Sequence, residues 1–386
     1  MSVDAGRRVS AYAGLPFIDE ITTAAGLSEW IGTAVRPYRI RVKPGHGALL
    51  AWRRESDQGI AGDWGWAAIV TDPAKLSNIR RRADRRGTPV TVHATSGGHD
   101  GPAVLLSGEL PGDPKLGKAI VRAGSGYSTS AEVLRYNPGR RLLLHSGTEV
   151  VRISVRGGSH VVAASRQWRE WGLPTLPVES IGGHGTSVRS PWWGRGDLAD
   201  APDPAVAAAV GEAVAHLHSR APAQALGRES RRRDLETELR SAGSRLLALT
   251  PELGADIRTI VGALATRLSA ESAEAEPVPI HGDLSPDQVL VDGDEFRIID
   301  LDRVGIGPVG IDIGTWAAAC RLSGHDAMER AFLDGCARRG GVAVDVEAWC
   351  ARALVVAAME PFRRCAPDWR SRTRAIVDLA KEALSR

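Results

Sequence analysis

The first half of the chain is a series of short apolar segments interrupted by turn residues. In YRIRVKPGHGALLAW (38–52), two apolar runs flank a Pro-Gly pair, which predicts a β-hairpin. The pattern returns in AEVLRYNPGRRLLLHSG (131–147). We expect either a duplicated hairpin or two β-subdomains built alike, and the chance recurrence of a common turn is the alternative.

Around these hairpins the pattern predicts further strands and a few helices. Apolar segments within 64–110 are expected to be strands. Helices are expected over 17–32, near 73–87 and over 113–124, and a strand followed by a helix is expected over 148–172. The N-terminal half is therefore mostly β.

The second half has the spacing of amphipathic helices. One helix is expected within 203–222, the helical pattern continues to about residue 270, a loop is expected over 270–279, and helices resume at Ile313. A single hairpin at 287–301 interrupts them. Mostly β followed by mostly α predicts an α+β fold with two lobes and a hinge near the Gly- and Pro-containing linker at 191–196.

Composition narrows the functional classes. The 386 residues are 43% hydrophobic and 25% charged, which is typical of a globular protein, and a net charge of +3 does not suggest a nucleic-acid binder. Four cysteines without a C-x-x-C pair indicate a reduced protein. The N-terminal residues lack the apolar region of a signal peptide, and no apolar run is long enough to span a membrane. We therefore expect a cytoplasmic protein with no membrane partner.

The stretch PIHGDLSPDQVLVDGDEFRIIDLDRVG (279–305) carries the candidate chemistry. Four residues separate Asp283 from Gln288, as in a kinase catalytic loop, where the Asp accepts a hydroxyl proton and an amide residue binds magnesium. Two apolar strands flank the DGDE turn, and a hairpin there would bring Gln288 and Asp300 to one point. This predicts a phosphoryl-transfer site, with ordinary surface acids on two strands as the alternative.

This stretch resembles the aminoglycoside phosphotransferase and choline kinase family, whose fold is similar to that of protein kinases. The resemblance is carried by HGD, the amide residue, the strand ending in IID and the element GPVGIDIGTW (307–316). The Gln variant and the Pro-Gly stretch before the kinase core are similar to maltokinase-like actinobacterial members. The resemblance covers about residues 131–386 and is strongest over 279–315.

The resemblance implies a bilobal protein-kinase-like fold with an extra β region before it. It implies three parts: an N-terminal cap region of a helix and a β-subdomain (1–125), a kinase-like N-lobe with the hinge (126–196), and a helical C-lobe with the catalytic loop and metal hairpin (197–386).

The resemblance also implies roles for the loop residues. Asp283 would orient and deprotonate an acceptor alcohol, and His281 would fix the loop by hydrogen bonding more than act in catalysis. Gln288 and Asp300 would hold Mg²⁺, and Asp312 would cap the loop backbone.

The nucleotide would be ATP, with GTP as the alternative. Arg152 takes the place of the lysine in the kinase strand motif and would hold the phosphates. Main-chain groups of Pro191, Trp192, Trp193 and Gly194 would pair with the base.

Several positions have a competing interpretation. An exposed strand arginine is an equal alternative for Arg152, because the following helix offers only Glu170 at its end and Gln167 as a weaker partner. Asp302 could be a second metal ligand, but an ion pair with Arg303 is favoured.

We expect an ATP- and Mg²⁺-dependent phosphotransferase acting on a hydroxyl of a small molecule such as a sugar, aminosugar or antibiotic, with antibiotic resistance as one use. Acids within 234–238 could receive a cationic acceptor, although a surface helix is favoured. One alternative is a kinase that modifies Ser or Thr of a precursor peptide, in which case the β region at 37–110 would bind the peptide or a protein partner. The other alternative is a weak pseudokinase scaffold. Retention of Asp283 and Asp300 argues against the scaffold.

Overall fold

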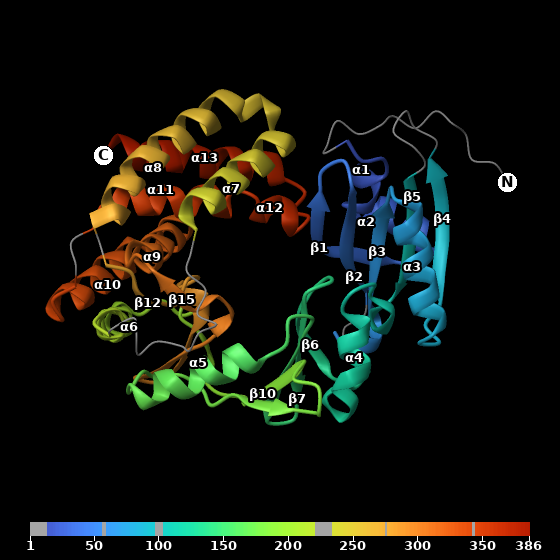
Figure 1. The fold of residues 1–386 in the computed structure, drawn as a ribbon, viewed down its shortest axis with the longest axis horizontal. Helices are drawn as coiled ribbons and strands as arrows, with labels where there is room; N and C mark the ends of the chain where they lie inside the picture. Colours follow the sequence, from blue (N-terminus) through green and yellow to red (C-terminus); the bar gives the residue numbers. More distant parts are fainter. Residues whose placement is uncertain (1–13, 56–58, 97–102, 221–233, 275, 342–343) are drawn as a thin grey trace. The chain divides into compact units, whose positions relative to one another are not determined.

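The structure is a computed structural model, and it describes residues 14–55, 59–96, 103–220, 234–274, 276–341 and 344–386 (Figure 1). The chain folds into two compact units. Unit 1 comprises the residues up to Gly158, Glu179–Ser190 and Glu360–Arg370. Unit 2 comprises Ser159–Val178, Pro191–Met359 and Ser371–Arg386. One boundary coincides with the start of the predicted hinge, while the three-part division implied by the resemblance stays a prediction.

Unit 1 begins with a five-stranded antiparallel sheet, here called the cap sheet. Its strands have the order β1-β2-β3-β5-β4 and are β1 (Val35–Lys43), β2 (Gly47–Arg54), β3 (Trp64–Val70), β4 (Val90–Ser96) and β5 (Ala103–Glu109). Helices α1 (Ile18–Ile21) and α2 (Ala24–Ile31) precede it. Helix α3 (Pro73–Asp84) connects β3 to β4 and packs on the sheet through Leu76 and Ile79.

The second sheet of unit 1, here called the N-lobe sheet, follows α4 (Gly117–Ala123) and has the same plan. Its order is β6-β7-β8-β10-β9, with β6 (Glu132–Asn137), β7 (Arg141–Ser146), β8 (Glu149–Ser154), β9 (Glu179–Ile181) and β10 (Ser187–Pro191). Helix α5 (Ser159–Glu170) follows the third strand, as α3 does in the cap sheet. Of the two expected arrangements, the structure shows two β-subdomains built alike.

The two sheets also match in register. A leucine of β2 pairs with Arg41 of β1 and with Ala68 of β3. A leucine of β7 pairs in the same way with Arg135 of β6 and Arg152 of β8. Ala68 therefore occupies the position in the cap sheet that Arg152 occupies in the N-lobe sheet.

One apolar core joins the two sheets. Trp64 of β3 and Tyr136 of β6 are buried and meet edge to face, with ring centroids 6.2 Å apart. Leu116, before α4, and Leu142 of β7 belong to the same buried cluster. Because burial of this cluster needs residues from both sheets, the sheets fold as parts of one unit.

A late segment of the chain also belongs to unit 1. Helix α12 (Glu360–Arg363) packs on β1, where Arg39 Nη2 donates to Glu360 Oε2 at 2.8 Å. Phe362 and Trp369 pack edge to face at 5.1 Å. The sequence pattern gives no indication of this long-range contact.

Unit 2 is mostly helical. Besides α5, its helices are α6 (Pro204–His218), α7 (Leu235–Leu249), α8 (Gly254–Glu274), α9 (Gly310–Ser323), α10 (Asp326–Arg338), α11 (Val346–Ala357) and α13 (Trp369–Ser385) (Figure 1). Helices α6 and α10 approach closely, since a Cβ on Gly211 would lie only 2.1 Å from the carbonyl oxygen of Phe332. Phe332 in turn stacks on Trp316 of α9, with ring centroids 4.4 Å apart.

Two small sheets interrupt these helices. β11 (Gly196–Asp197), β13 (Val289–Asp292) and β14 (Glu295–Ile298) form one, and β12 (Val278–Ile280) pairs with β15 (Gly305–Gly307) in the other. The predicted hairpin at 287–301 is confirmed.

Two local predictions need correction. The helix expected over 17–32 is divided, because Thr23 accepts a hydrogen bond from Gly26 N–H and thereby starts α2 as a separate helix. The loop expected over 270–279 is wrong in its first part, since α8 continues to Glu274. The helical pattern over 228–233 lies outside the described residues.

No described helix combines the length and apolar character needed to cross a membrane. All four cysteines are free, and burial raises the pKa of each thiol to about 12.

Candidate active site

The segment 281–304, here called the catalytic segment, starts and ends at paired strands. β12 leads into it and β15 follows it, with Ile280 directly opposite Gly305. The loop and the hairpin therefore leave the small sheet and return to it at one point.

A buried carboxylate holds the start of the segment. Asp312 of α9 is 0% exposed and accepts hydrogen bonds from His281 N–H at 2.8 Å and Gly282 N–H at 2.7 Å. His218 of α6 donates from Nε2 at 3.1 Å. Burial alone would raise the pKa of Asp312, but the hydrogen bond and charge of His218, with His281, bring it below its ordinary value. Asp312 thus caps the loop, as predicted.

His281 is only 1% exposed and links the loop to the end of the hairpin. Its Nε2 lies 2.8 Å from the Ile299 carbonyl oxygen, and its Nδ1 accepts from Asp283 N–H at 3.3 Å. A carbonyl can only accept, so both bonds form together only when the ring is neutral with its proton on Nε2. Gly282, with φ 80°, permits the sharp turn between the two residues.

Asp283 remains accessible. Its side chain is 38% exposed, and Oδ1 accepts from Arg303 Nη1 at 2.8 Å. Burial raises the pKa of Asp283, the Arg303 charge opposes this and the Asp300 charge adds to it, so the pKa lies above its ordinary value. A reachable carboxylate whose pKa is raised is a stronger proton acceptor than an ordinary one.

The partner of Arg303 corrects a prediction. Arg303 was expected to pair with Asp302, but it pairs with Asp283, and Asp302 Oδ1 instead lies 3.6 Å from His160 Nε2 of α5. Leu301–Arg303 form a 3₁₀ turn, in which consecutive side chains point about 120° apart. Neighbours in the sequence therefore face different partners.

The hairpin register brings Gln288 and Asp300 together. Val289 of β13 lies opposite Ile298 of β14, and Ile299 N–H donates to the Gln288 carbonyl at 2.9 Å. Asp300 follows with φ 57° and ψ 51°, a left-handed conformation that is unusual for a residue other than glycine. Gln288 is 7% exposed, and its side-chain amide makes no hydrogen bond to another described residue.

These donors suit magnesium. Amide and carboxylate oxygens are hard ligands, and Mg²⁺ in nucleotide sites commonly uses one or two carboxylates together with phosphates and water. Within the described ranges, no group of three or more His, Cys, Asp or Glu side chains could hold a metal ion. Gln288 and Asp300 would supply the protein oxygens of such a site.

The predicted base-binding hinge is joined to the same hairpin. β11 pairs with β13, and a Cβ on Gly194 would lie 3.0 Å from the Val291 carbonyl oxygen. The Trp193 ring lies 4.7 Å from the guanidinium of Arg297 on β14. Trp192 is 49% exposed. The hinge and the metal hairpin therefore share one framework.

Two of the predicted nucleotide-binding residues, Pro191 and Arg152, lie on strands of the N-lobe sheet and not on the hairpin. Pro191 is the last residue of β10, and Arg152 lies on β8 in unit 1, so the phosphate contact of Arg152 stays a prediction. In unit 2, Gln167 Nε2 donates to Glu170 Oε2 at 3.3 Å. The two candidate partners of Arg152 are thus bonded to each other.

The acids considered for a cationic acceptor have structural contacts. Asp234 accepts from a backbone N–H of the first turn of α7, and Glu236 pairs with Arg240 one turn later. Glu238 pairs with the buried Arg352 at 2.9 Å. These contacts agree with the surface-helix interpretation.

The family described as "Phosphotransferase enzyme family" matches residues 173–366, which include the hinge, the catalytic segment and the capping helix α9. The chain belongs to this family. No curated protein sequence matches this chain.

A solved structure with a TM-score above 0.5 supports the fold. A choline/ethanolamine kinase family protein from Mesorhizobium loti is similar with a TM-score of 0.53 and 16% identity, over 68% of this chain and 90% of that chain. Spectinomycin phosphotransferase, solved in complex with ADP and spectinomycin, has a TM-score of 0.49 and 12% identity, over 66% of this chain and 92% of that chain. Such identities show fold alone. The predicted kinase-like α+β fold is confirmed, and the maltokinase-like resemblance stays a prediction.

The roles of two residues of the candidate site escaped the sequence reasoning. Arg303 ends the 3₁₀ turn that follows β14, and its contact with Asp283 had no signal beyond that position. His218 had one, because the helix that contains it ends in Leu-His, as in the resembled family.

Proposed function

We propose that the protein transfers the γ-phosphoryl group of ATP to a hydroxyl of a small molecule with the help of Mg²⁺, and that GTP is the alternative donor. The observation that carries this proposal is the convergence of Asp283, Gln288 and Asp300 within one clamped segment. Phosphoryl transfer requires positioning and charge neutralisation more than covalent chemistry, which such a segment can supply.

Asp283 acts as the base. Its exposed carboxylate accepts the hydroxyl proton of the acceptor as the acceptor oxygen attacks the γ-phosphorus. The bond between that phosphorus and the β,γ-bridging oxygen breaks, and ADP leaves with its electron pair. Arg303 holds this carboxylate at 2.8 Å, and His281 fixes the backbone N–H of the same residue. Both contacts orient Asp283 before the acceptor arrives.

Gln288 and Asp300 hold Mg²⁺, which when bound neutralises phosphate charge. The left-handed backbone of Asp300 directs its carboxylate away from the regular hairpin geometry. Trp192, Trp193 and Gly194 receive the base, and Arg152 of the N-lobe sheet holds the phosphates.

A thermal-shift experiment tests the nucleotide site. ATP at about a hundredfold excess over its dissociation constant stabilises a protein by about 2.7 kcal/mol. We expect a Mg²⁺-dependent rise in Tm for the native chain and its loss in Asp300→Asn. Asp292→Asn, at the exposed turn of the same hairpin, is the matched control and keeps the rise. A native chain without any Mg²⁺-dependent nucleotide shift would make the protein a pseudokinase scaffold.

A transfer assay then tests the acceptor. Nucleotide-dependent phosphorylation is measured across aminoglycosides, neutral sugars and Ser-containing peptides, with Asp283→Asn as the inactive control. Phosphorylation of an aminoglycoside or sugar supports the proposal. Phosphorylation of peptides alone would replace the acceptor class with a precursor peptide.

A further inference from the structure

An unusual concentration of arginine lies in unit 1, outside the catalytic segment. The side chains come from β1, β6, the turn after β8 and α12, and they are Arg39, Arg41, Arg135, Arg156 and Arg363. We call this group the arginine cluster. Arg41 and Arg135 hold equivalent register positions in the edge strands of the two similar sheets.

The first carboxylate beside the arginine cluster is already used on both oxygens. Glu360 Oε2 accepts from Arg39 at 2.8 Å, and Oε1 accepts from Arg363 at 2.7 Å. The charges of these two arginines bring the pKa of Glu360 to about 2 against the opposing effect of burial. Glu360 is therefore ionised, and its single negative charge is shared by two arginines.

The second carboxylate is closed off. Asp113 is 0% exposed, and Oδ1 accepts from Lys115 N–H at 2.8 Å and from Leu116 N–H at 2.7 Å. Oδ2 accepts from Tyr136 Oη–H at 2.7 Å and from Gly139 N–H at 2.8 Å. Asp113 thus fixes the turn between β6 and β7 and offers no oxygen to the arginine cluster.

The positive charge of the cluster is consequently in excess. Arg41 Nη1 donates to a neutral acceptor, the Pro138 carbonyl, at 3.0 Å. In the part of the chain that the structure describes, neither Arg135 nor Arg156 pairs with a carboxylate. Burial lowers the pKa of Arg39 against the opposing effect of Glu360, and the charge of Arg135 lowers it further. Burial also lowers the pKa of Arg41 against the opposing charge of Asp113, and the charge of Arg156 adds to the lowering.

Partly buried charges of one sign are costly unless a counter-charge approaches them. Several guanidinium groups also present the planar, bidentate donors that match phosphate oxygens better than those of any other anion-binding side chain. Arg156 is exposed, and so is Lys115, which like Arg41 lies beside Gly139, so this side of the cluster is open to solvent.

We propose that the arginine cluster is a binding site for a phosphate-bearing small molecule, separate from the nucleotide site. The ligand supplies two or more negative charges that Glu360 and Asp113 cannot. This site does not depend on the proposed transfer reaction, and it stands or falls with anion binding to unit 1.

Thermal shift with inorganic phosphate on the full chain tests the proposal, with sodium chloride holding the ionic strength constant. We expect 10 mM phosphate to raise Tm by about 2–4 °C, the effect of roughly 1 kcal/mol in a chain of this class. The double variant Arg135→Gln with Arg156→Gln loses the rise. Arg122→Gln, which removes an exposed charge on α4 of the same unit, keeps it.

Two further measurements test whether the phosphate-induced rise in Tm comes from the nucleotide site or from binding of any multivalent anion. The double variant Arg152→Gln with Asp300→Asn should keep the phosphate shift, and its loss there would place the probe in the nucleotide site and overturn the proposal. Citrate should stabilise less than phosphate, and an equal or larger effect of citrate would overturn the assignment to phosphate.

A measurement without any probe checks the charge excess itself. Arg135→Gln relieves like-charge repulsion, so its Tm should exceed that of the native chain at low ionic strength, and the difference should vanish at 0.5 M sodium chloride. A lower Tm at low ionic strength would show that Arg135 is already neutralised and would overturn the proposal.

Discussion

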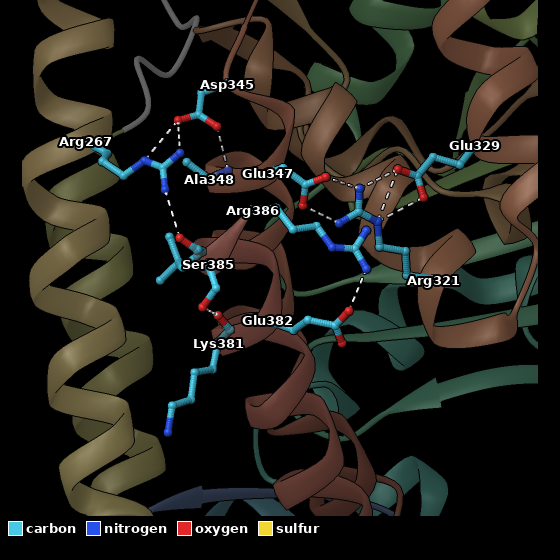
Figure 2. Close-up of polar contacts among 11 residues, drawn as sticks. Arg267, Arg321, Glu329, Asp345, Glu347, Ala348, Lys381, Glu382, Ser385 and Arg386 are labelled. Carbon is cyan, nitrogen blue, oxygen red and sulfur yellow. Dashed lines mark hydrogen bonds and ion pairs between the residues drawn. The ribbon is translucent and has the colours of Figure 1, made fainter.

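Unit 2 contains two groups of charged residues that are built in opposite ways. In Figure 2, Arg321 of α9 donates from Nε and Nη2 to Glu329, at 3.0 and 2.7 Å, and from Nη1 and Nη2 to Glu347, at 2.6 and 2.9 Å. The Arg321 side chain is 16% exposed and that of Glu329 is 11% exposed. In the catalytic segment, by contrast, Asp283 has one ion pair and stays 38% exposed.

The ion pairs around the Arg321 group lie nearer the surface. Arg267 of α8 donates from Nε to Asp345 at 3.0 Å, and Asp345 also accepts from Ala348 N–H to begin α11 (Figure 2). Arg386 pairs with Glu382 at the end of α13. The Arg267–Asp345 pair connects α8 to the start of α11, whereas Arg386 and Glu382 are neighbours on one turn of the chain.

The contrast shows how the same residue types serve stability or chemistry. The hydrogen bonds of Glu329 and Glu347 raise the pKa of Arg321, which means that the fold favours its charged form. Burial raises the pKa of Asp283, which means that the fold disfavours its charged form. A charge that the fold fully satisfies holds helices together, whereas a charge that it leaves reachable can bind a substrate or a proton.

The largest expected effect is on catalysis. Asp283→Asn should lower kcat by about 10²–10⁴-fold, because the base is lost while the shape is kept. The free energy of unfolding should not fall, since the variant removes a charge that the fold disfavours. Steady-state kinetics and urea denaturation check both halves. If the variant lost stability but kept its kcat, Asp283 would have a structural role like that of Glu329, and not a catalytic one.

The second effect is on stability. Arg321→Met should lower the free energy of unfolding by about 3–5 kcal/mol, because it removes the ion-pair partner of the buried Glu329 and of the half-buried Glu347. Kinetics per folded molecule should be unchanged. Arg240→Met, which removes an exposed partner of Glu236, is the matched control and should cost below about 0.5 kcal/mol. If urea denaturation showed equal losses for Arg321→Met and Arg240→Met, the distinction between the closed Arg321 group and an exposed ion pair would be wrong.

An intermediate effect is expected where the two kinds of site meet. Asp312→Asn keeps one acceptor oxygen but loses the charge that receives His218 and the two loop N–H groups. We expect a loss of about 1–3 kcal/mol in the free energy of unfolding, together with a lower kcat, because the loop start is released. Hydrogen exchange of His281 and Gly282 N–H measures the release directly. Unchanged protection of both would show that Asp312 is not what holds the loop.

The smallest effect separates the groups by pH. Asp283 must be ionised to act, so kcat/KM should fall as the pH drops through a pKa above the ordinary value of about 3.9. Asp312 has a lowered folded pKa, so its stabilisation is complete above about pH 3.9 and is lost only as the pH falls through the folded value. Activity should therefore decline at a higher pH than stability does.

Arg303→Gln sharpens this pH test. Removing the Arg303 charge should move the acidic limb of the kcat/KM profile upward, because that charge lowers the pKa of Asp283. The midpoint of acid unfolding serves as the reference. A limb that stays in place would mean that another group controls it.

The sequence by itself determined the local arrangements. The Pro-Gly pairs fixed the two similar hairpins, and the spacing from Asp283 to Asp300 fixed a loop and a hairpin that bring Gln288 beside Asp300. Each of these depends on residues near one another in the chain, where turn chemistry and strand alternation decide the geometry.

Only the tertiary structure decided which charges meet. Arg303 faces Asp283 and not its neighbour Asp302, Asp312 receives His218 from another helix, and Glu360 joins Arg39 from the opposite end of the chain. Such pairs depend on how whole elements pack, and packing is driven by non-directional burial of apolar surface that a local pattern does not encode.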